Sequence, residues 1–285
     1  ASVGNPWGMD PGSRLAWAKD LDVPVAKPGV AYDVLYWVGC SASYDRRAQK
    51  IARAMVKILK AAGIHFAVMQ EERCHGDFAR RAGEEYLFQT AAAENIENLR
   101  KYQFKELVAA CPHCFNTLKN EYPQFEGGTF NCVSHTVLID RLITEGRIKV
   151  SKSQFFTVMH DPCYLARMNG ITAEPRRVLE TLGAHLREAK HSKADTLCCG
   201  AGGAQIFMDR PARINVIRLK ELKDTKSEVV ASACPHCLTM LTSAQAQQKE
   251  GAKDEVLFLD VAEIVAQQLE SAAAEETSGS QRHGS

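Results

Sequence analysis

The sequence lacks three features that would each indicate a familiar class of protein. Its 35 Lys and Arg residues nearly balance its 34 Asp and Glu residues, so the net charge of +1 gives no electrostatic reason to expect nucleic acid as a partner. No run reaches the roughly 18 to 20 consecutive apolar residues that a membrane-spanning helix needs. The start of the chain has no signal-peptide pattern, which favours a cytoplasmic, reducing location.

Two cofactor-binding motifs are also missing. No Gly-rich dinucleotide fingerprint follows a first strand, so nothing predicts a flavin or nicotinamide bound by this chain. No closely spaced CxxCxxC run is present either. The chain begins at Ala1 rather than Met, which leaves open whether it is processed, trimmed or a piece of a longer polypeptide.

Cysteine, by contrast, is abundant, and nine of the ten cysteines form two series of nearly identical spacing, each ending in Cys-Pro-His-Cys. The first series is Cys40, Cys74, Cys111 and Cys114, and the second is Cys163, Cys198, Cys199, Cys234 and Cys237. An offset of 123 residues takes Cys40 to Cys163 and each CPHC cysteine to its counterpart, and an offset of 124 takes Cys74 to Cys198. This regularity indicates an internal repeat whose function depends on sulfur.

The elements expected along the chain follow the same repeat. A polar lead-in segment covers residues 1–32, the first repeat covers 33–150, the second covers 151–270, and a disordered tail covers 271–285. In the first repeat, the pattern predicts strands at 33–38, 64–69 and 107–110, and helices that end at Gly63, span 77–102 and begin near 115. In the second repeat, it predicts strands at 155–159, 186–189, 229–233 and 256–259, and helices at 175–182, 210–222 and 262–269.

This alternation of strands and helices predicts an α/β fold. We expect two pseudo-symmetric repeats, each a mostly parallel sheet flanked by helices. The cysteines fall just after strand ends, where open α/β sheets place their ligand sites. Cys132 belongs to neither series; it falls in the strand-like segment 130–133 and is expected to be a buried structural thiol.

The chemistry of the two series differs in the number of thiols. A CxxC turn alone is ambiguous between zinc, an iron–sulfur cluster and a redox dithiol, and a disulfide framework suits short secreted chains better than this one. The five thiols of the second series exceed the four that tetrahedral zinc requires. Its adjacent Cys198 and Cys199 suit a body of several iron atoms, and the glycines at 200, 202 and 203 allow backbone N–H groups to approach sulfide.

The second series resembles the CCG-domain, or cysteine-rich domain, iron–sulfur oxidoreductases. Their signature is a Cys followed at long intervals by CCG and CxxC, and the resemblance covers about residues 33–270. The family includes the B and D subunits of heterodisulfide reductase and the iron–sulfur subunits of glycerol-3-phosphate and lactate oxidation systems. Segments 80–89 (RRAGEEYLFQ), 112–124 (PHCFNTLKNEYPQ) and 160–165 look most like the members associated with electron-transfer flavoprotein and menaquinone.

The resemblance implies a noncubane [4Fe–4S] cluster held by the five cysteines of the second series. Cys198, Cys199 and His160 are then the candidate catalytic residues, since His160 resembles a family position beside the cluster. The histidines between the CPHC cysteines, His113 and His236, are expected to orient their turns by hydrogen bonding.

The first series departs from the signature, because His75 stands where the second cysteine of CCG would be. Its four thiolates are enough for a cubane [4Fe–4S] cluster or for zinc. His75 itself could ligate iron, donate a hydrogen bond to sulfide, or simply line the site.

The resemblance also implies a role in a complex. We expect a module that passes electrons between a ferredoxin-like iron–sulfur domain or subunit, or an electron-transfer flavoprotein or other flavoprotein, and a membrane-embedded quinone-reactive subunit. Association with a membrane would then occur through those partners. The alternatives are the catalytic subunit of a heterodisulfide or disulfide reductase, and a non-enzymatic zinc-binding scaffold.

Overall fold

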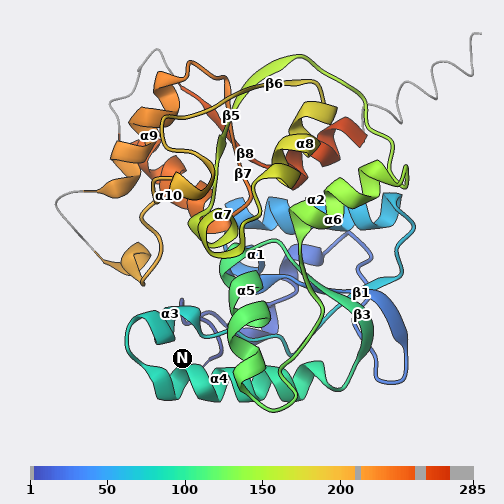
Figure 1. Ribbon diagram of the computed structural model, residues 1–285. Coiled ribbons are helices and arrows are strands. Elements are labelled where there is room, and N and C mark those ends of the chain that lie inside the picture. The colour runs from blue at the N-terminus through green and yellow to red at the C-terminus, as the bar shows by residue number, and fades with distance from the viewer. Residues whose placement is uncertain (1–2, 209–212, 248–254, 270–285) are drawn as a thin grey trace, which may run out of the picture.

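The fold consists of two four-stranded, entirely parallel sheets, one in each half of the chain (Figure 1). The computed structural model describes residues 3–208, 213–247 and 255–269. The strand orders are β2-β1-β3-β4 and β6-β5-β7-β8, so the two repeats share one topology. The predicted α/β class with two parallel sheets is therefore confirmed.

The strands of the first sheet are β1 (Ala31–Trp37), β2 (Phe66–Val68), β3 (Gln103–Ala109) and β4 (Cys132–Ser134). Those of the second are β5 (Phe155–His160), β6 (Ala184–Arg187), β7 (Val229–Ser232) and β8 (Leu257–Asp260). The first-repeat helices are α1 (Gly39–Tyr44), α2 (Arg46–Ala61), α3 (Asp77–Arg81), α4 (Glu85–Leu99), α5 (Pro112–Asn116) and α6 (His135–Thr144). The second-repeat helices are α7 (Cys163–Asn169), α8 (Ala173–Thr181), α9 (Ile214–Asp224), α10 (Pro235–Ala246) and residues 261–269.

The central strand pair of each sheet sets the position of the cysteines. Leu35 of β1 pairs with Leu107 of β3, and Val158 of β5 pairs with Val230 of β7. Because parallel strands end at the same edge of a sheet, the segments after β1 and β3 emerge side by side, and so do those after β5 and β7. The cysteines that follow these strands are thereby brought to one edge of each sheet.

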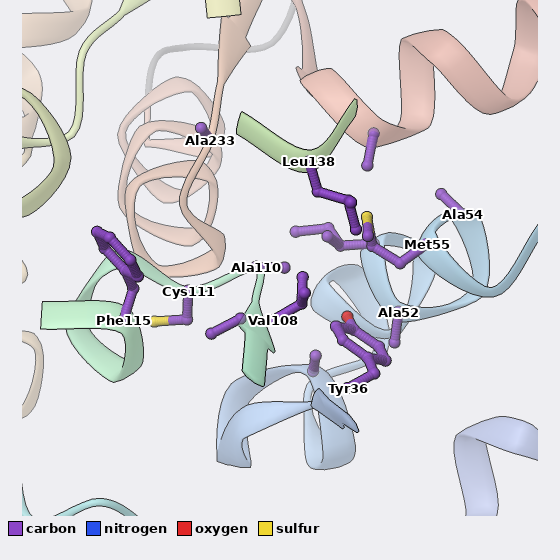
Figure 2. Close-up of a cluster of buried hydrophobic side chains, with 14 of the residues drawn as sticks. Tyr36, Ala52, Ala54, Met55, Val108, Ala110, Cys111, Phe115, Leu138 and Ala233 are labelled. Carbon is purple, nitrogen blue, oxygen red and sulfur yellow. The ribbon is translucent and has the colours of Figure 1, made fainter. Parts of the chain in front are cut away.

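One large hydrophobic core runs through both repeats, and a second, small cluster of buried residues includes Cys199, Cys234 and Cys237. Helix α2 packs against α10, α5 against α7, and α6 against α8, so helices of the first repeat lie between the two sheets (Figure 1). Figure 2 shows part of this core, in which Met55 and Leu138 of the first repeat and Ala233 of the second contribute buried side chains. The burial of this shared apolar surface holds the two repeats together.

Several predicted boundaries differ from the structure, and two of these differences have a clear local cause. The helix expected over 77–102 is broken into α3 and α4, because Gly83 between them adopts a φ of 91° that a helix cannot contain. The helix expected from 115 begins instead at Pro112, directly inside the CPHC turn, where a proline at the first helical position loses no hydrogen bond. Gly63 follows α2 with a φ of 60°, as expected for a left-handed C-terminal residue.

The lead-in segment packs onto the first repeat. Its side chains of Arg14 and Trp17 are buried, and Val25 forms a parallel bridge with Val68 at the edge of β2. The predicted tail, 271–285, and the first residues of the helix expected over 210–222 lie outside the described residues. No helix in the described ranges has the length and apolar character needed to cross a bilayer.

Candidate metal centre

The thiols are presented where strands end and helices begin. Cys111 and Cys234 are the N-cap residues of α5 and α10, each followed by proline at the first helical position. Cys163 is the first residue of α7, and Cys40 lies in the first turn of α1. The free N–H groups of a helix N-terminus stabilise negative charge. They act against the neighbouring thiols and the burial, which raise the pKa of Cys40, Cys163 and Cys234.

The five thiols of the second series form a continuous chain of contacts. Cys198 makes hydrogen-bond contacts with Cys163 and Cys199, Cys199 contacts Cys237, and Cys237 contacts Cys234. The hydrogen bond from Cys163 lowers the pKa of the Cys198 thiol, while that to Cys198 raises the pKa of Cys199. When thiols lie this close, the ionisation of one makes the ionisation of its neighbours less favourable, and a bound cation would reduce this repulsion.

The thiols of the first series are grouped in a similar way. Cys40 contacts Cys74, and Cys111 contacts Cys114. Gly39 precedes Cys40 with a φ of 78°, and a Cβ at this position would lie 3.1 Å from the Cys114 sulfur. Only glycine therefore combines the required backbone conformation with room for that thiol.

The two series meet at a direct contact between Cys111 and Cys234. Beside it, the rings of His113 and His236 lie edge to face, with centroids 5.1 Å apart. Phe78 contacts both rings, at centroid distances of 5.8 and 5.3 Å. The sequence predicted two sites, one in each repeat, without placing them relative to each other, and the structure brings them together into one sulfur-rich region.

The Cys74-His75-Gly76 loop of the first repeat and the Cys198-Cys199-Gly200 loop of the second have the same backbone geometry. Gly76 and Gly200 adopt φ angles of 91° and 90°, and each donates its N–H to the thiol two residues earlier. The distance from the Gly200 nitrogen to the Cys198 sulfur is 3.2 Å. This contact agrees with the expectation that the glycines of the CCG loop direct N–H groups at sulfur. Because the two loops share this geometry, His75 occupies the position in the first repeat that Cys199 occupies in the second.

His75 is buried and neutral at pH 7, because desolvation lowers its pKa to about 4. Its Nδ1 accepts the backbone N–H of Asp77 at 3.3 Å, and its carbonyl accepts the hydroxyl of Tyr122. The negative charge of Cys111 acts on the ring, so His75 lies close to the first-series thiols. Whether it ligates a metal stays a prediction.

His160 lies at the end of β5 and is also buried. The ligand atoms of His160, Cys199 and Cys237 all fall within 4.8 Å of one another. Its Nδ1 accepts the Nε–H of Arg218 at 3.0 Å, and its Nε2 has no hydrogen-bond partner among the described residues. Burial, followed by the charge of Arg218, lowers the pKa of His160 to about 3, so the ring is neutral.

Asp77 connects the two repeats beside the thiols, a role that the sequence did not reveal. It accepts a 2.7 Å hydrogen bond from His113 Nδ1 and a 3.0 Å hydrogen bond from the hydroxyl of Tyr164, which lies on α7. The ring of Tyr164 also stacks on that of His113, with centroids 4.2 Å apart. The hydrogen bond to Asp77 agrees with the expectation that hydrogen bonding orients this histidine. The sequence feature that could have drawn attention to Asp77 is its position directly after Cys74-His75-Gly76.

A second set of residues that the sequence did not single out stabilises the backbone just before Cys40. Glu72 accepts the N–H groups of Val38 and Gly39, both at 2.8 Å, and forms a buried ion pair with Arg14. In the second repeat, Asp161 forms a bidentate pair with Arg176 at 2.8 Å and accepts the N–H of Lys193. Nothing in the sequence marked Arg14 as a partner of a residue 58 positions away.

Cys132 remains apart from these thiols, on β4, where it pairs with Leu107. It is partly rather than fully buried and packs against the main core, and desolvation raises its pKa to about 12. All ten cysteines are free thiols.

The residues present fit an iron–sulfur group. Grouped thiolates are the ligands that zinc and iron–sulfur clusters prefer, and the second series offers one thiol more than tetrahedral zinc uses. The backbone N–H groups aimed at sulfur and the unpartnered Nε2 of His160 are donors suited to a sulfur-rich body. Together, fold and site define a two-repeat α/β protein with a thiolate metal centre.

The chain belongs to the cysteine-rich domain (CCG) family, whose model matches it twice, over residues 34–119 and 157–242. Each match contains one of the two cysteine series and most of the first three strands of one sheet, whereas β4 and β8 lie outside the matched ranges. The resemblance seen in the sequence is therefore confirmed, and with it iron–sulfur binding as the general property of the site.

Curated relatives agree with this assignment. A probable membrane-anchored ferredoxin of Chromohalobacter salexigens is 40% identical over 94% of this chain, and the EtfAB:quinone oxidoreductase of Syntrophomonas wolfei is 34% identical over 93%. The D subunit of the dihydromethanophenazine:CoB–CoM heterodisulfide reductase of Methanosarcina barkeri is 32% identical over 93% of this chain and 65% of its own length. The chain spans about two fifths of the first two relatives, 40% and 39%. A solved structure of an aspartate racemase homologue from Pyrococcus horikoshii is similar only at a TM-score of 0.35, with 12% identity over 86% of this chain and 100% of that one.

Proposed function

We propose that this chain is the electron-transferring module of an iron–sulfur oxidoreductase. The five thiolates of the second series hold a noncubane [4Fe–4S] cluster, and the four thiolates of the first series hold a second [4Fe–4S] cluster. The observation that carries the proposal is the unbroken run of sulfur contacts from Cys163 through Cys234 to Cys111 and Cys114. Centres that adjoin in this way can exchange electrons without an intervening carrier.

Each group of the chain has a part in this function. When bound, the clusters supply one-electron transfer. The thiolates hold them, and the N–H groups of Gly76 and Gly200 stabilise negative charge on sulfur. The rings of His113, His236 and Phe78 fill the space beside the contact between the series and exclude water from it.

We place the module between a flavoprotein or ferredoxin-like donor and a membrane-embedded quinone-reactive subunit. The similarity to a protein named EtfAB:quinone oxidoreductase supports this choice, as do the segments 80–89 and 112–124. A cluster passes single electrons, whereas a quinone or a disulfide needs two, so a partner such as a flavoprotein, whose flavin can exchange one or two electrons, is needed.

Disulfide reduction is the second candidate. It is supported by the similarity to the D subunit of a heterodisulfide reductase and by the closeness of the two sites, since a disulfide needs two electrons at one place. A thiol titration separates the two roles. A thiol that perturbs the spectrum of the second-series cluster supports substrate sulfur on iron, and a lack of effect supports the relay.

The test of the proposal is iron, acid-labile sulfide and zinc analysis of the anaerobically purified chain. We expect iron and sulfide in equal amounts and broad absorption at about 400 nm, which iron–sulfur clusters show and zinc sites do not. Double replacement of Cys163 and Cys237 by Ala should remove one paramagnetic signal, and that of Cys40 and Cys114 the other. Colourless protein with zinc in both sites would refute the proposal in favour of the zinc-binding scaffold.

A further inference from the structure

We propose that Arg218 is a positioning residue that fixes His160 as a hydrogen-bond donor toward sulfur, and not as a metal ligand. The inference rests on the proposed function, because it requires a cluster held by Cys199 and Cys237. It extends that function by assigning a role to a buried cation on α9, a helix that carries none of the cysteines.

The hydrogen bond between the two side chains determines the tautomer of His160. Arginine has only donor groups, so the 3.0 Å contact from Arg218 Nε must end on a lone pair of His160 Nδ1. A neutral imidazole whose Nδ1 accepts carries its proton on Nε2. Ligation through Nε2 would need the lone pair at that atom and a proton on Nδ1, which would then oppose the N–H of Arg218.

The proton on Nε2 has no acceptor in the described part of the chain. His160 is 1% exposed, so water does not supply one freely, and an unpaired buried N–H is unfavourable. Because Nδ1 is occupied by Arg218, Nε2 is the ring atom left to face Cys199 and Cys237, which lie within 4.8 Å. A thiolate or sulfide of the bound cluster satisfies the donor.

Arg218 is held so that it cannot easily turn away. It is fully buried, and its Nη1 donates to the carbonyl of His191 at 2.9 Å and forms an ion pair with Glu221 at 3.1 Å. These contacts fix the guanidinium plane and therefore the direction of its Nε–H. Hydrogen bonds to cluster sulfurs raise reduction potential, so the pair would make the second-series cluster easier to reduce.

The experiment uses the cluster-loaded chain labelled with ¹⁵N-histidine. Electron–nuclear double resonance of the reduced second-series cluster is recorded in H₂O and D₂O. We expect a proton coupling that exchanges with deuterium and no strong ¹⁵N coupling. In Arg218→Met the exchangeable coupling should be lost and the midpoint potential should fall, whereas Arg218→Lys, which keeps a donor, should restore both. His160→Phe should match Arg218→Met.

The control is Arg187→Met, which removes a second-repeat arginine that donates to the carbonyls of Thr225 and Lys226. It should change neither the coupling nor the potential. A strong ¹⁵N coupling in the wild type would show ligation and overturn the inference, and so would a wild-type spectrum without an exchangeable proton, even if the Arg218 variants fail to fold. Absence of any second-series cluster from the wild type would refute the proposed function instead.

Discussion

Replacing Arg47 with Met should weaken the attachment of the second repeat to the first. Arg47 lies on α2, and its guanidinium forms two hydrogen bonds with Glu263, at 2.9 and 2.8 Å, and one with the carbonyl of Phe258, at 2.6 Å. Glu263 in turn accepts the N–H of Asp260, where the helix at 261–269 begins. Methionine retains much of the apolar stem but none of the donors.

The expected cost follows from the burial of the pair. The Glu263 side chain is 8% exposed and that of Arg47 is 23% exposed. Removing one partner of a buried ion pair costs about 3–5 kcal/mol, and partial exposure of the arginine reduces our expectation to about 2–3 kcal/mol. At about 2–4 °C per kcal/mol, the melting temperature should fall by roughly 4–12 °C.

The penalty should also depend on pH. Burial raises the pKa of Glu263, and Arg47 opposes this rise, so the pKa should increase further in the variant. An acid whose pKa is higher in the folded state costs stability above its unfolded pKa, and this cost disappears as the pH falls below both values. The melting temperatures of the cluster-bound wild type and variant should therefore differ more at about pH 7 than at about pH 5, which is close to the usual pKa of a glutamate.

The matched control is Arg177→Met. Arg177 on α8 pairs with Asp140 on α6 and so also crosses between the repeats, but its side chain is 52% exposed. We expect a melting temperature close to that of the wild type, because exposed pairs contribute little. Equal melting temperatures for the wild type and Arg47→Met, or a penalty that is the same at both pH values, would refute this reasoning.

Further predictions concern the two sites separately. Cys199→Ala should change one electron paramagnetic resonance signal and leave the other intact, and an unchanged spectrum and iron content would contradict the five-thiolate assignment. His75→Cys should shift the first-series signal toward that of the second series; an identical spectrum would show that position 75 does not face the cluster. Gly39→Ala should lower iron loading of the first series alone, because its Cβ would meet the Cys114 sulfur at 3.1 Å in a backbone conformation that alanine disfavours; normal loading would exclude that clash. The isolated chain should accept electrons from dithionite but show negligible turnover with a physiological donor and acceptor, whereas robust turnover would remove the need for partners.

Much of the fold could be predicted because its signals are local. The apolar segments at 33–38 and 107–110 matched β1 and β3 within a few residues, since buried parallel strands require short runs of strand-forming residues. The break at Gly83 was missed because the helical pattern continues on both sides of it. The clustering of thiols within each series was predictable, since parallel strands end at one edge.

The sequence by itself determined the repeat, the parallel α/β architecture and the set of thiols, because spacing and residue type are properties of the chain. Only the tertiary structure decided that Cys111 and Cys234 touch, that Arg14 pairs with Glu72, and that Arg218 holds His160. These contacts join residues far apart in the sequence, and they depend on how separate elements pack against one another in three dimensions. The complementary shapes of packed elements follow no repeating pattern along the chain, so they cannot be read from any one segment of the sequence.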